Sequence, residues 1–191
     1  MPVTATNLTA GPGLLYVGAF GATEPADSAI NTTPVASTWV DVGGTQDGST
    51  LNITREFLEL EVDQIVDMPG RRLTNRDLQI TTNMAEPTLI NLQTALNGGT
   101  ITASAAWQSY DPDNTVAATQ PTYKALLLDG YAPQSAAAVT MRRRVIARKV
   151  LSIDDVETAY KKDEQTLLPV TFGCHYVSSV IAPFHIVDQL T

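Results

Sequence analysis

The chain has 191 residues and a formal net charge of −8, with an apolar fraction of 43% and a charged fraction of 17%. This length suits one domain, and the balance of apolar and charged residues excludes an intrinsically disordered chain. The acidic excess argues against tight binding to nucleic acid, because affinity for phosphate comes from Lys and Arg.

The N-terminal part of the chain predicts short strands separated by irregular segments. Residues 1–12 are small and polar, and we expect an extended arm, either frayed or lying on a neighbouring subunit. Short apolar runs predict strands at residues 14–18 and 39–42. Between them, residues 21–38 are rich in Pro, Ala, Ser and Thr and lack periodicity, which indicates a long loop.

Apolar and hydrophilic side chains alternate with a period of two through two segments, residues 51–63 and 72–84. This period is that of a β-strand with one apolar and one hydrophilic face. We expect the two strands to be adjacent and antiparallel, with Leu78, Ile80 and Met84 packed on a core and the other face in water. The hydrophilic faces carry Glu59, Glu61, Asp63, Asp77, Gln79, Thr81 and Asn83.

One helix is expected at residues 87–96. It begins with a proline, which suits a first turn because the missing N–H would be unpaired there in any case. Leu89, Leu92 and Leu96 recur at helical spacing, and Asn97-Gly98 is typical of a C-terminal stop. We expect this helix to cover the apolar face of the sheet.

The C-terminal half again predicts strands and turns. The strands are expected at residues 101–107, 123–128, 139–153 and 167–177, with a last segment at 182–187. Together these elements predict a mainly β fold, a β-sandwich or partial barrel with one α-helix, in a single domain over residues 1–191 that includes the N-terminal arm.

No catalytic residue, metal site or cofactor is predicted, and we expect the chain not to be an enzyme. None of the common nucleotide-binding, hydrolase or metalloprotease motifs occurs. Cys174 and His175 are neighbours on a predicted strand, so they point to opposite faces and could not bind one metal together. Glu59 and Glu61 lie about 6.6–7 Å apart along a strand. The two catalytic carboxylates of some glycosidases have a similar separation. Aromatic residues for a sugar cleft are sparse, however, so a solvated strand face is the better interpretation.

Arginines concentrate on the strand predicted at residues 139–153. Alternation divides them between two faces without interleaved aromatic residues, which is a poor pattern for nucleic acid. A solvated strand is one interpretation, and ion pairs with carboxylates of a neighbouring copy fit an acidic chain better. The arginines concerned are Arg142, Arg143, Arg144 and Arg148.

The loop between the two alternating strands, near residues 64–70, is also expected to contact other copies. It combines a Pro-Gly turn with flanking arginines between two long strands. The candidate contact residues are Gln64, Met68, Pro69, Arg71 and Arg72.

Two segments and the order of the N-terminal strands resemble the major tail tube protein of long-tailed bacteriophages. In the first segment, Val62-Asp63-Gln64 is followed by Pro69, the pair Arg71-Arg72, an alternating strand and the sequence MAEPTLINL at residues 84–92. The second segment is AYKKDEQTLLPVTFGCHY at residues 159–176. The N-terminal order of a short strand, a long loop and WVDVG is similar as well.

This resemblance implies a structural virion protein whose rings, expected to be hexameric, stack into the hollow tail tube. Strands of neighbouring copies would join edge to edge into a shared β-barrel around the channel. DNA would pass through as a passenger that does not bind, facing the seven hydrophilic strand residues named above.

The resemblance also implies partners and a location. The tape measure, tail terminator and tail-tip proteins would be partners, and no membrane contact is expected. The chain would be assembled in the host cytoplasm and reside in the virion. The alternative function is a carbohydrate-binding or adhesive β-sandwich that decorates a virion.

Overall fold

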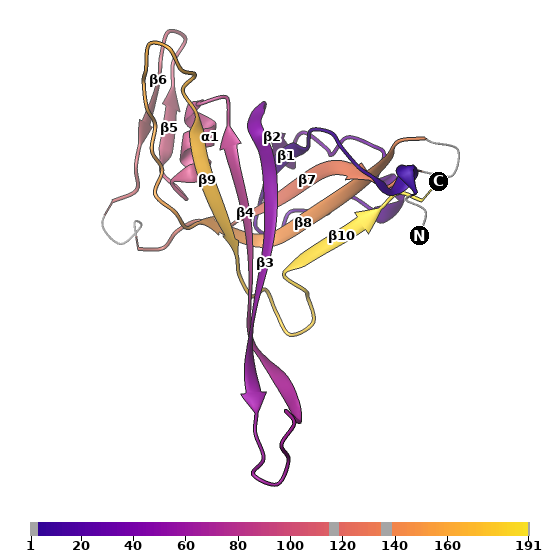
Figure 1. Cartoon of the computed structure of the whole chain (residues 1–191). Helices are drawn as coiled ribbons and strands as arrows, with labels where there is room; N and C mark the ends of the chain where they lie inside the picture. Colours follow the sequence, from indigo (N-terminus) through magenta and orange to yellow (C-terminus); the bar gives the residue numbers. More distant parts are fainter. Residues whose placement is uncertain (1–3, 115–118, 135–138, 191) are drawn as a thin grey trace.

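The computed structural model describes residues 4–114, 119–134 and 139–190. Its main element is an antiparallel sheet of eight strands in the order β2-β1-β7-β8-β9-β4-β3, with β10 paired to β8 beside this path (Figure 1). The first strands along the chain are β1 Leu14–Ala19, β2 Trp39–Asp41, β3 Thr45–Leu60 and β4 Gly70–Met84. The later ones are β7 Lys124–Ala132, β8 Met141–Ser152, β9 Leu168–Cys174 and β10 Phe184–Asp188.

Smaller elements accompany the sheet. They are the helix α1 Leu89–Ala95, the hairpin of β5 Thr100–Ala103 and β6 Gln108–Asp111, and two 3₁₀ turns at Ala5–Asn7 and Asp27–Ala29. None of the helices in the described residues is long and apolar enough to cross a membrane. The predicted fold class, mainly β with one α-helix, is confirmed for the described chain. The sheet stays open in this part, because β2 and β3 are its two ends.

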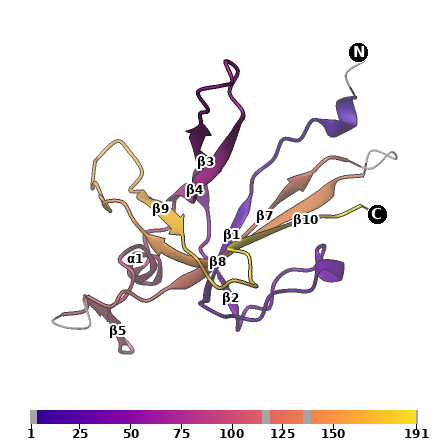
Figure 2. The same cartoon turned by 90° about the horizontal axis from the view of Figure 1, so that it is seen from below.

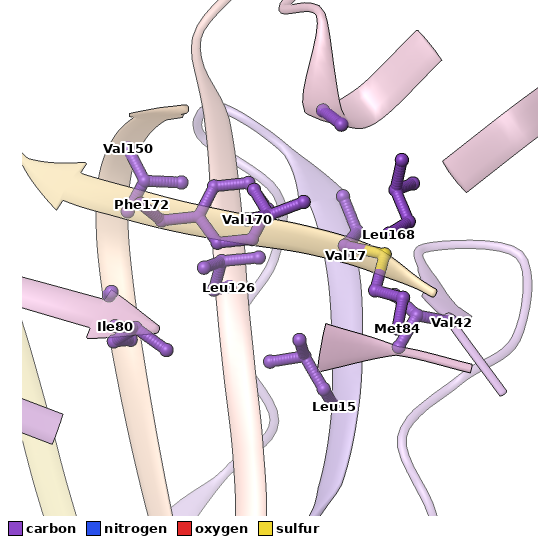
Figure 3. Close-up of a cluster of buried hydrophobic side chains, with 12 residues drawn as sticks. Leu15, Val17, Val42, Ile80, Met84, Leu126, Val150, Leu168, Val170 and Phe172 are labelled. Carbon is purple, nitrogen blue, oxygen red and sulfur yellow. The ribbon is translucent and has the colours of Figure 1, made fainter. Parts of the chain in front are cut away.

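The main core lies inside the curve of the sheet (Figure 3). Its residues come from β1, which is near one end of the sheet, and from β4, which is near the other. Strands so far apart in one sheet can share a cluster only if the sheet curves around it. The cluster consists of Leu15, Val17, Val42, Ile80, Met84, Ala95, Leu126, Ala147, Val150, Leu168, Val170 and Phe172.

A second, smaller core lies on the opposite face of β1, β7 and β8. It contains Tyr16, Leu127 and Ile146, which alternate along their strands with residues of the main core. Trp39 completes it, and its indole N–H donates to the carbonyl of Thr23 over 3.0 Å. The long predicted loop before β2 therefore covers this face of the sheet.

The two alternating strands are adjacent and antiparallel, as predicted. Leu78, Ile80 and Met84 are buried, which confirms the apolar face of the second strand. The first strand differs, because it ends at Leu60 and leaves both Leu60 and Val62 exposed. Their alternation with carboxylates is therefore not that of a strand half buried in its own subunit.

The helix is shorter than predicted and is held to the sheet in a different way. The hydroxyl of Thr88 caps it by accepting a hydrogen bond from the N–H of Asn91 over 3.2 Å. Asn91 is buried and donates through Nδ2 to the carbonyls of Val42 and Glu86, each over 2.8 Å. Leu96, at the end of the predicted leucine stripe, is exposed. Leu92 of the stripe and Ala95 do pack on the main core, so the helix covers the apolar face as expected, and the buried amide of Asn91 adds hydrogen bonds that the pattern did not predict.

The strand predicted at residues 101–107 is instead the first half of a hairpin. β5 ends at Ala103, and the N–H of Ser104 donates to the carbonyl of Trp107 over 2.8 Å to close the turn. β6 then returns antiparallel to β5.

The predicted N-terminal arm is hydrogen-bonded to the segment that directly follows β7. The carbonyl of Thr6 accepts a hydrogen bond from the N–H of Gln134 over 2.7 Å. Residues 1–3 of the arm lie outside the described residues.

Candidate functional site

Residues 53–77 of β3, β4 and the loop between them leave the body of the molecule (Figures 1 and 2), and we refer to them as the projecting hairpin. Both strands are far longer than an ordinary strand of about 5–6 residues, with 16 residues in β3 and 15 in β4. β9 pairs with β4 only from Gln79 to Met84. The hairpin therefore extends past the neighbouring strand.

The projecting hairpin exposes large apolar side chains along both strands and at its tip. Their exposed fractions run from 40% at Ile53 to 104% at Val66. Phe57 and Leu58 are neighbours on β3 and point to opposite sides, so both faces of the hairpin expose apolar side chains. Exposed apolar surface of this kind on a soluble protein marks an interaction site. Sequence reasoning named Met68 of this surface as a contact residue but missed its other members, although the unusual length of the alternating strands was a signal for them. Its members are Ile53, Phe57, Leu58, Leu60, Val62, Ile65, Val66, Met68 and Leu73.

A β-bulge divides the projecting hairpin. The register shifts between Glu56 and Phe57, so Thr74 is an extra residue on β4, and its hydroxyl donates to the carbonyl of Glu56 over 3.1 Å. A bulge bends its strand and increases the local twist. Beyond it, Glu59 faces Arg71, with Oε1 2.9 Å from Nη2. Both side chains are exposed, so this ion pair contributes only about 0–1 kcal/mol.

The seven residues predicted to line the hydrophilic strand faces do not form one face. Glu59 lies on the same face of β3 as Leu51, because an even number of residues separates them, and the register partner of Leu51 is the core residue Ile80. Asp77 is an odd number of residues from Ile80 and so lies on the opposite face. Glu61 and Asp63 follow the end of β3 and lie in the tip loop. The register and the bulge decide which residues of two paired strands share a face of the sheet. Alternation within one strand predicts neither the register nor the bulge. The members that do share a face of β4 are Asp77, Gln79, Thr81 and Asn83.

Those four belong to a wider surface that we call the polar face. Gln79 Nε2 donates to Asp77 Oδ2 over 2.8 Å, and the hydroxyls of Thr81 and Thr171 lie 3.4 Å apart. Asp77 is its one ionisable member. The polar face consists of Thr50, Asn52 and Thr54 of β3 and of Asp77, Gln79, Thr81 and Asn83 of β4, with the buried Thr171 of β9 beside them.

Two exposed or half-buried arginines of β8 have carboxylate partners within the chain. Arg143 Nη2 lies 2.6 Å from Asp188 Oδ2, and Arg148 Nη2 lies 2.9 Å from Glu24 Oε2. The hydrogen bond from Arg143 lowers the pKa of Asp188, and the bond to Glu24 raises the pKa of Arg148. Both arginines therefore already form an ion pair with a carboxylate of their own subunit.

Arg144 is enclosed in the subunit, where its guanidinium pairs with Asp129. In this conformation it does not reach a neighbouring copy, so the expected contact between copies is wrong for this residue. Arg142 is half-buried and lines a cavity of about 80 Å³ with Pro12 and Tyr131. Ion pairs between copies stay a prediction for Arg142, Arg143 and Arg148.

The five candidate contact residues around the loop lie together. All are on the projecting hairpin and all are exposed. They are Gln64, Met68, Pro69, Arg71 and Arg72.

Metal and thiol chemistry gain no support from the described side chains. Within the described ranges, no group of three or more His, Cys, Asp or Glu could hold a metal ion. Burial, and to a lesser degree the charge of Asp77, raises the pKa of the Cys174 thiol to about 12. His175 lies beside it with its ring edge-on to Tyr123, the ring centroids 5.5 Å apart.

Comparison with known proteins assigns the family. No curated protein matches the chain. A crystal structure of an Hcp protein aligns over 94% of this chain and 100% of its own, with 11% identity and a TM-score of 0.35. The family model for phage tail tube proteins matches residues 4–179. The chain therefore belongs to the phage tail tube protein family, whose members are structural components of the virion tail.

Proposed function

We propose that copies of this chain form hexameric rings, that the rings stack into a hollow tube, and that DNA passes through the tube to the host. The observation that carries this proposal is the projecting hairpin. Its large apolar side chains stay at least 40% exposed in the subunit, and burying this surface against another copy would be favourable. Membership of the tail tube family supports the proposal independently.

A free sheet edge supports joining of copies side by side. β3 ends the sheet, and in the described part of the chain β4 is its one strand partner. A long exposed edge is a template for pairing with another chain, and closure of a ring removes it. We expect the outer edge of β3 to pair with an edge strand of the next copy.

The polar face is the proposed wall of the channel. Hydroxyl and amide side chains with one carboxylate do not hold phosphate, because the release of counterions that drives such binding requires Lys or Arg. A wall of this kind would let DNA pass each ring without being retained. Asp77, Gln79, Thr81 and Asn83 keep the lumen role predicted from the sequence. Glu59, Glu61 and Asp63 are assigned instead to the hairpin and its contacts.

Further partners follow from the proposed tube. The tape measure protein would occupy the channel before DNA, and tail terminator and tail-tip proteins would close its two ends. Assembly would take place in the host cytoplasm. These partners rest on family membership and not on a surface of the subunit.

Microscopy and sedimentation of the purified chain test the proposal. We expect rings or tubes from the unmodified protein and monomers from the double variant Leu58→Asp, Leu60→Asp. The variant should keep its circular dichroism spectrum, because both leucines are exposed and outside the core. Tyr160→Asp with Val180→Asp is the matched control, since it places the same two charges at exposed residues outside the hairpin.

Two results would count against the proposed tube. One is an unmodified chain that stays monomeric up to high concentration. The other is a monomer that binds glycans, which would favour the alternative of a carbohydrate-binding module.

A further inference from the structure

The tip of the projecting hairpin, residues 61–69, is both apolar and acidic. Val62, Ile65, Val66 and Met68 are all exposed large apolar side chains. The same segment carries three carboxylates, at Glu61, Asp63 and Asp67, and has no Lys or Arg. Such a tip has a clear complement, namely an apolar cavity with a cation beside it.

The body of the subunit has a cavity of this description. Its volume is about 280 Å³, which exceeds the roughly 150 Å³ that can hold a benzene ring. Its floor is the second core, with Trp39 and Ile146, and its rim includes the partly exposed side chains of Phe20 and Ile181. The side chain of Ala22 forms part of the wall.

A cation that has no carboxylate partner among the described residues lies next to this cavity. The ammonium of Lys149 lies 5.5 Å from the ring centre of Phe20 and 4.3 Å from that of Tyr123. Within the described residues it makes no ion pair, whereas Arg148 in the cavity wall is neutralised by Glu24. The charge beside the cavity is thus opposite in sign to that of the tip.

The tip cannot fill the cavity of its own chain. The stretch of β3 over residues 53–60 spans about 23 Å at the rise of a β-strand, and both views show the tip at the far end of the hairpin from the body (Figures 1 and 2). The occupant must therefore come from another molecule, and a second copy carries a segment of the required chemistry.

We propose that the hairpin tip of one copy seats Ile65 and Val66 in the cavity between Phe20 and Ile181 of a second copy, with the tip carboxylates toward Lys149. This contact rests on the proposed assembly and adds to it a specific partner surface. It explains why the subunit leaves Val66 entirely exposed and why the cavity is open. The contact repeats once per subunit, so its strength would be multiplied around every ring.

Cysteine cross-linking between two differently tagged variants tests this contact. Val66→Cys in one preparation and Ile181→Cys in the other should form a mixed disulfide dimer on mild oxidation. Val66→Cys mixed with Tyr160→Cys is the control and should not, because Tyr160 is exposed but does not line the cavity. The native Cys174 does not interfere, since burial raises the pKa of its thiol to about 12.

A second variant fills the cavity. Ala22→Phe in the Ile181→Cys background should lower the yield of mixed dimer about tenfold, the effect of about 1.4 kcal/mol lost from the contact. Lys149→Glu should also lower the yield of mixed dimer, because it places a carboxylate next to the carboxylates of the tip. This decrease should be larger at low salt than at high salt, since salt screens the repulsion. Both substitutions lie outside the main core, and circular dichroism checks that the fold is kept.

The outcomes separate this contact from the proposed tube. Rings or tubes that form without the mixed disulfide, or a yield unchanged by Ala22→Phe, would overturn the contact and leave the tube intact. An unmodified chain that forms neither rings nor tubes and gives no mixed disulfide would overturn both.

Discussion

Arg144 and Asp129 form a buried two-point ion pair, in which Nε lies 2.6 Å from Oδ1 and Nη2 lies 2.8 Å from Oδ2. Their side chains are 1% and 4% exposed. Nη2 also donates to the carbonyls of Ile30 and Thr32, over 3.3 and 3.0 Å. One guanidinium thus joins β7 and β8 to the loop that covers the second core.

Asp129→Ala should lower the free energy of unfolding by about 3–5 kcal/mol, because it leaves the buried charge of Arg144 without a counter-charge. Urea unfolding followed by tryptophan fluorescence measures this change. Asp188→Ala is the matched control, since it removes the partner of the partly exposed Arg143 and should cost about 0–1 kcal/mol. Equal losses in the two variants would show that burial does not set the strength of these pairs.

The Arg143–Asp188 pair should contribute to stability only above acidic pH. The hydrogen bond from Arg143 lowers the pKa of Asp188 below its ordinary value of 3.8. A carboxyl whose pKa is lower in the folded state stabilises the fold above the unfolded value, and this contribution is lost as pH falls through the folded value. The difference in unfolding free energy between the native chain and Asp188→Asn should therefore be constant at neutral pH, begin to fall at about pH 4, and vanish only once the pH is below the lowered pKa of folded Asp188. A difference that persists at lower pH would point to packing.

The Cys174 thiol should react slowly with a disulfide reagent in the folded protein. The thiolate is the reactive form, and burial, with a smaller effect of Asp77, raises the pKa to about 12. At pH 8 we expect labelling to be slower than in urea by a large factor and to follow unfolding. Immediate stoichiometric labelling of the native chain would contradict the burial of this side chain.

Asn97 should be important for joining the helix to β8. Its Nδ2 donates to the carbonyl of Ser152 and its Oδ1 accepts from the N–H of Ser152, both over 2.7 Å. Its φ of 58° is in the left-handed region. Asn97→Ala should cost about 2–3 kcal/mol through lost hydrogen bonds and backbone strain.

Asn97→Gly separates the two causes, because glycine adopts this backbone freely. It should cost about 1 kcal/mol less than Asn97→Ala in the same unfolding experiment. Equal costs would assign the whole effect to the hydrogen bonds.

The channel assignment can be tested by two pairs of lysine substitutions. Gln79→Lys with Thr81→Lys on the polar face should permit assembly but slow DNA ejection, more so at low salt, because the lysines would hold phosphates. Glu59→Lys with Glu61→Lys places two lysines on the hairpin instead, where they also remove two carboxylates, and should leave the ejection rate of well-formed tails unchanged. Ejection slowed only by the hairpin pair would mean that the hairpin, and not the polar face, lines the channel.

The sequence by itself determined the features that depend on local pattern. Alternation over residues 72–84 predicts that Leu78 and Ile80 face a core, because side chains of a strand point to opposite sides with a period of two. The same reasoning pairs β3 with β4, and Asn97-Gly98 marks the end of the helix through its backbone preference. The family, too, was recognisable from residues along the chain.

Only the tertiary structure decided which residues meet across the chain. Arg148 and Glu24 pair although 124 positions separate them, and no local pattern brings them together. Glu59 and Asp77 lie on opposite faces because the register and the bulge at Thr74 combine the faces of two strands. The alternation of Leu60 and Val62 looks like that of a half-buried strand. These residues are exposed, however, because the hairpin extends beyond β9, the neighbouring strand of the sheet. Burial depends on what lies opposite a side chain, and in a single copy of this protein nothing described lies opposite these.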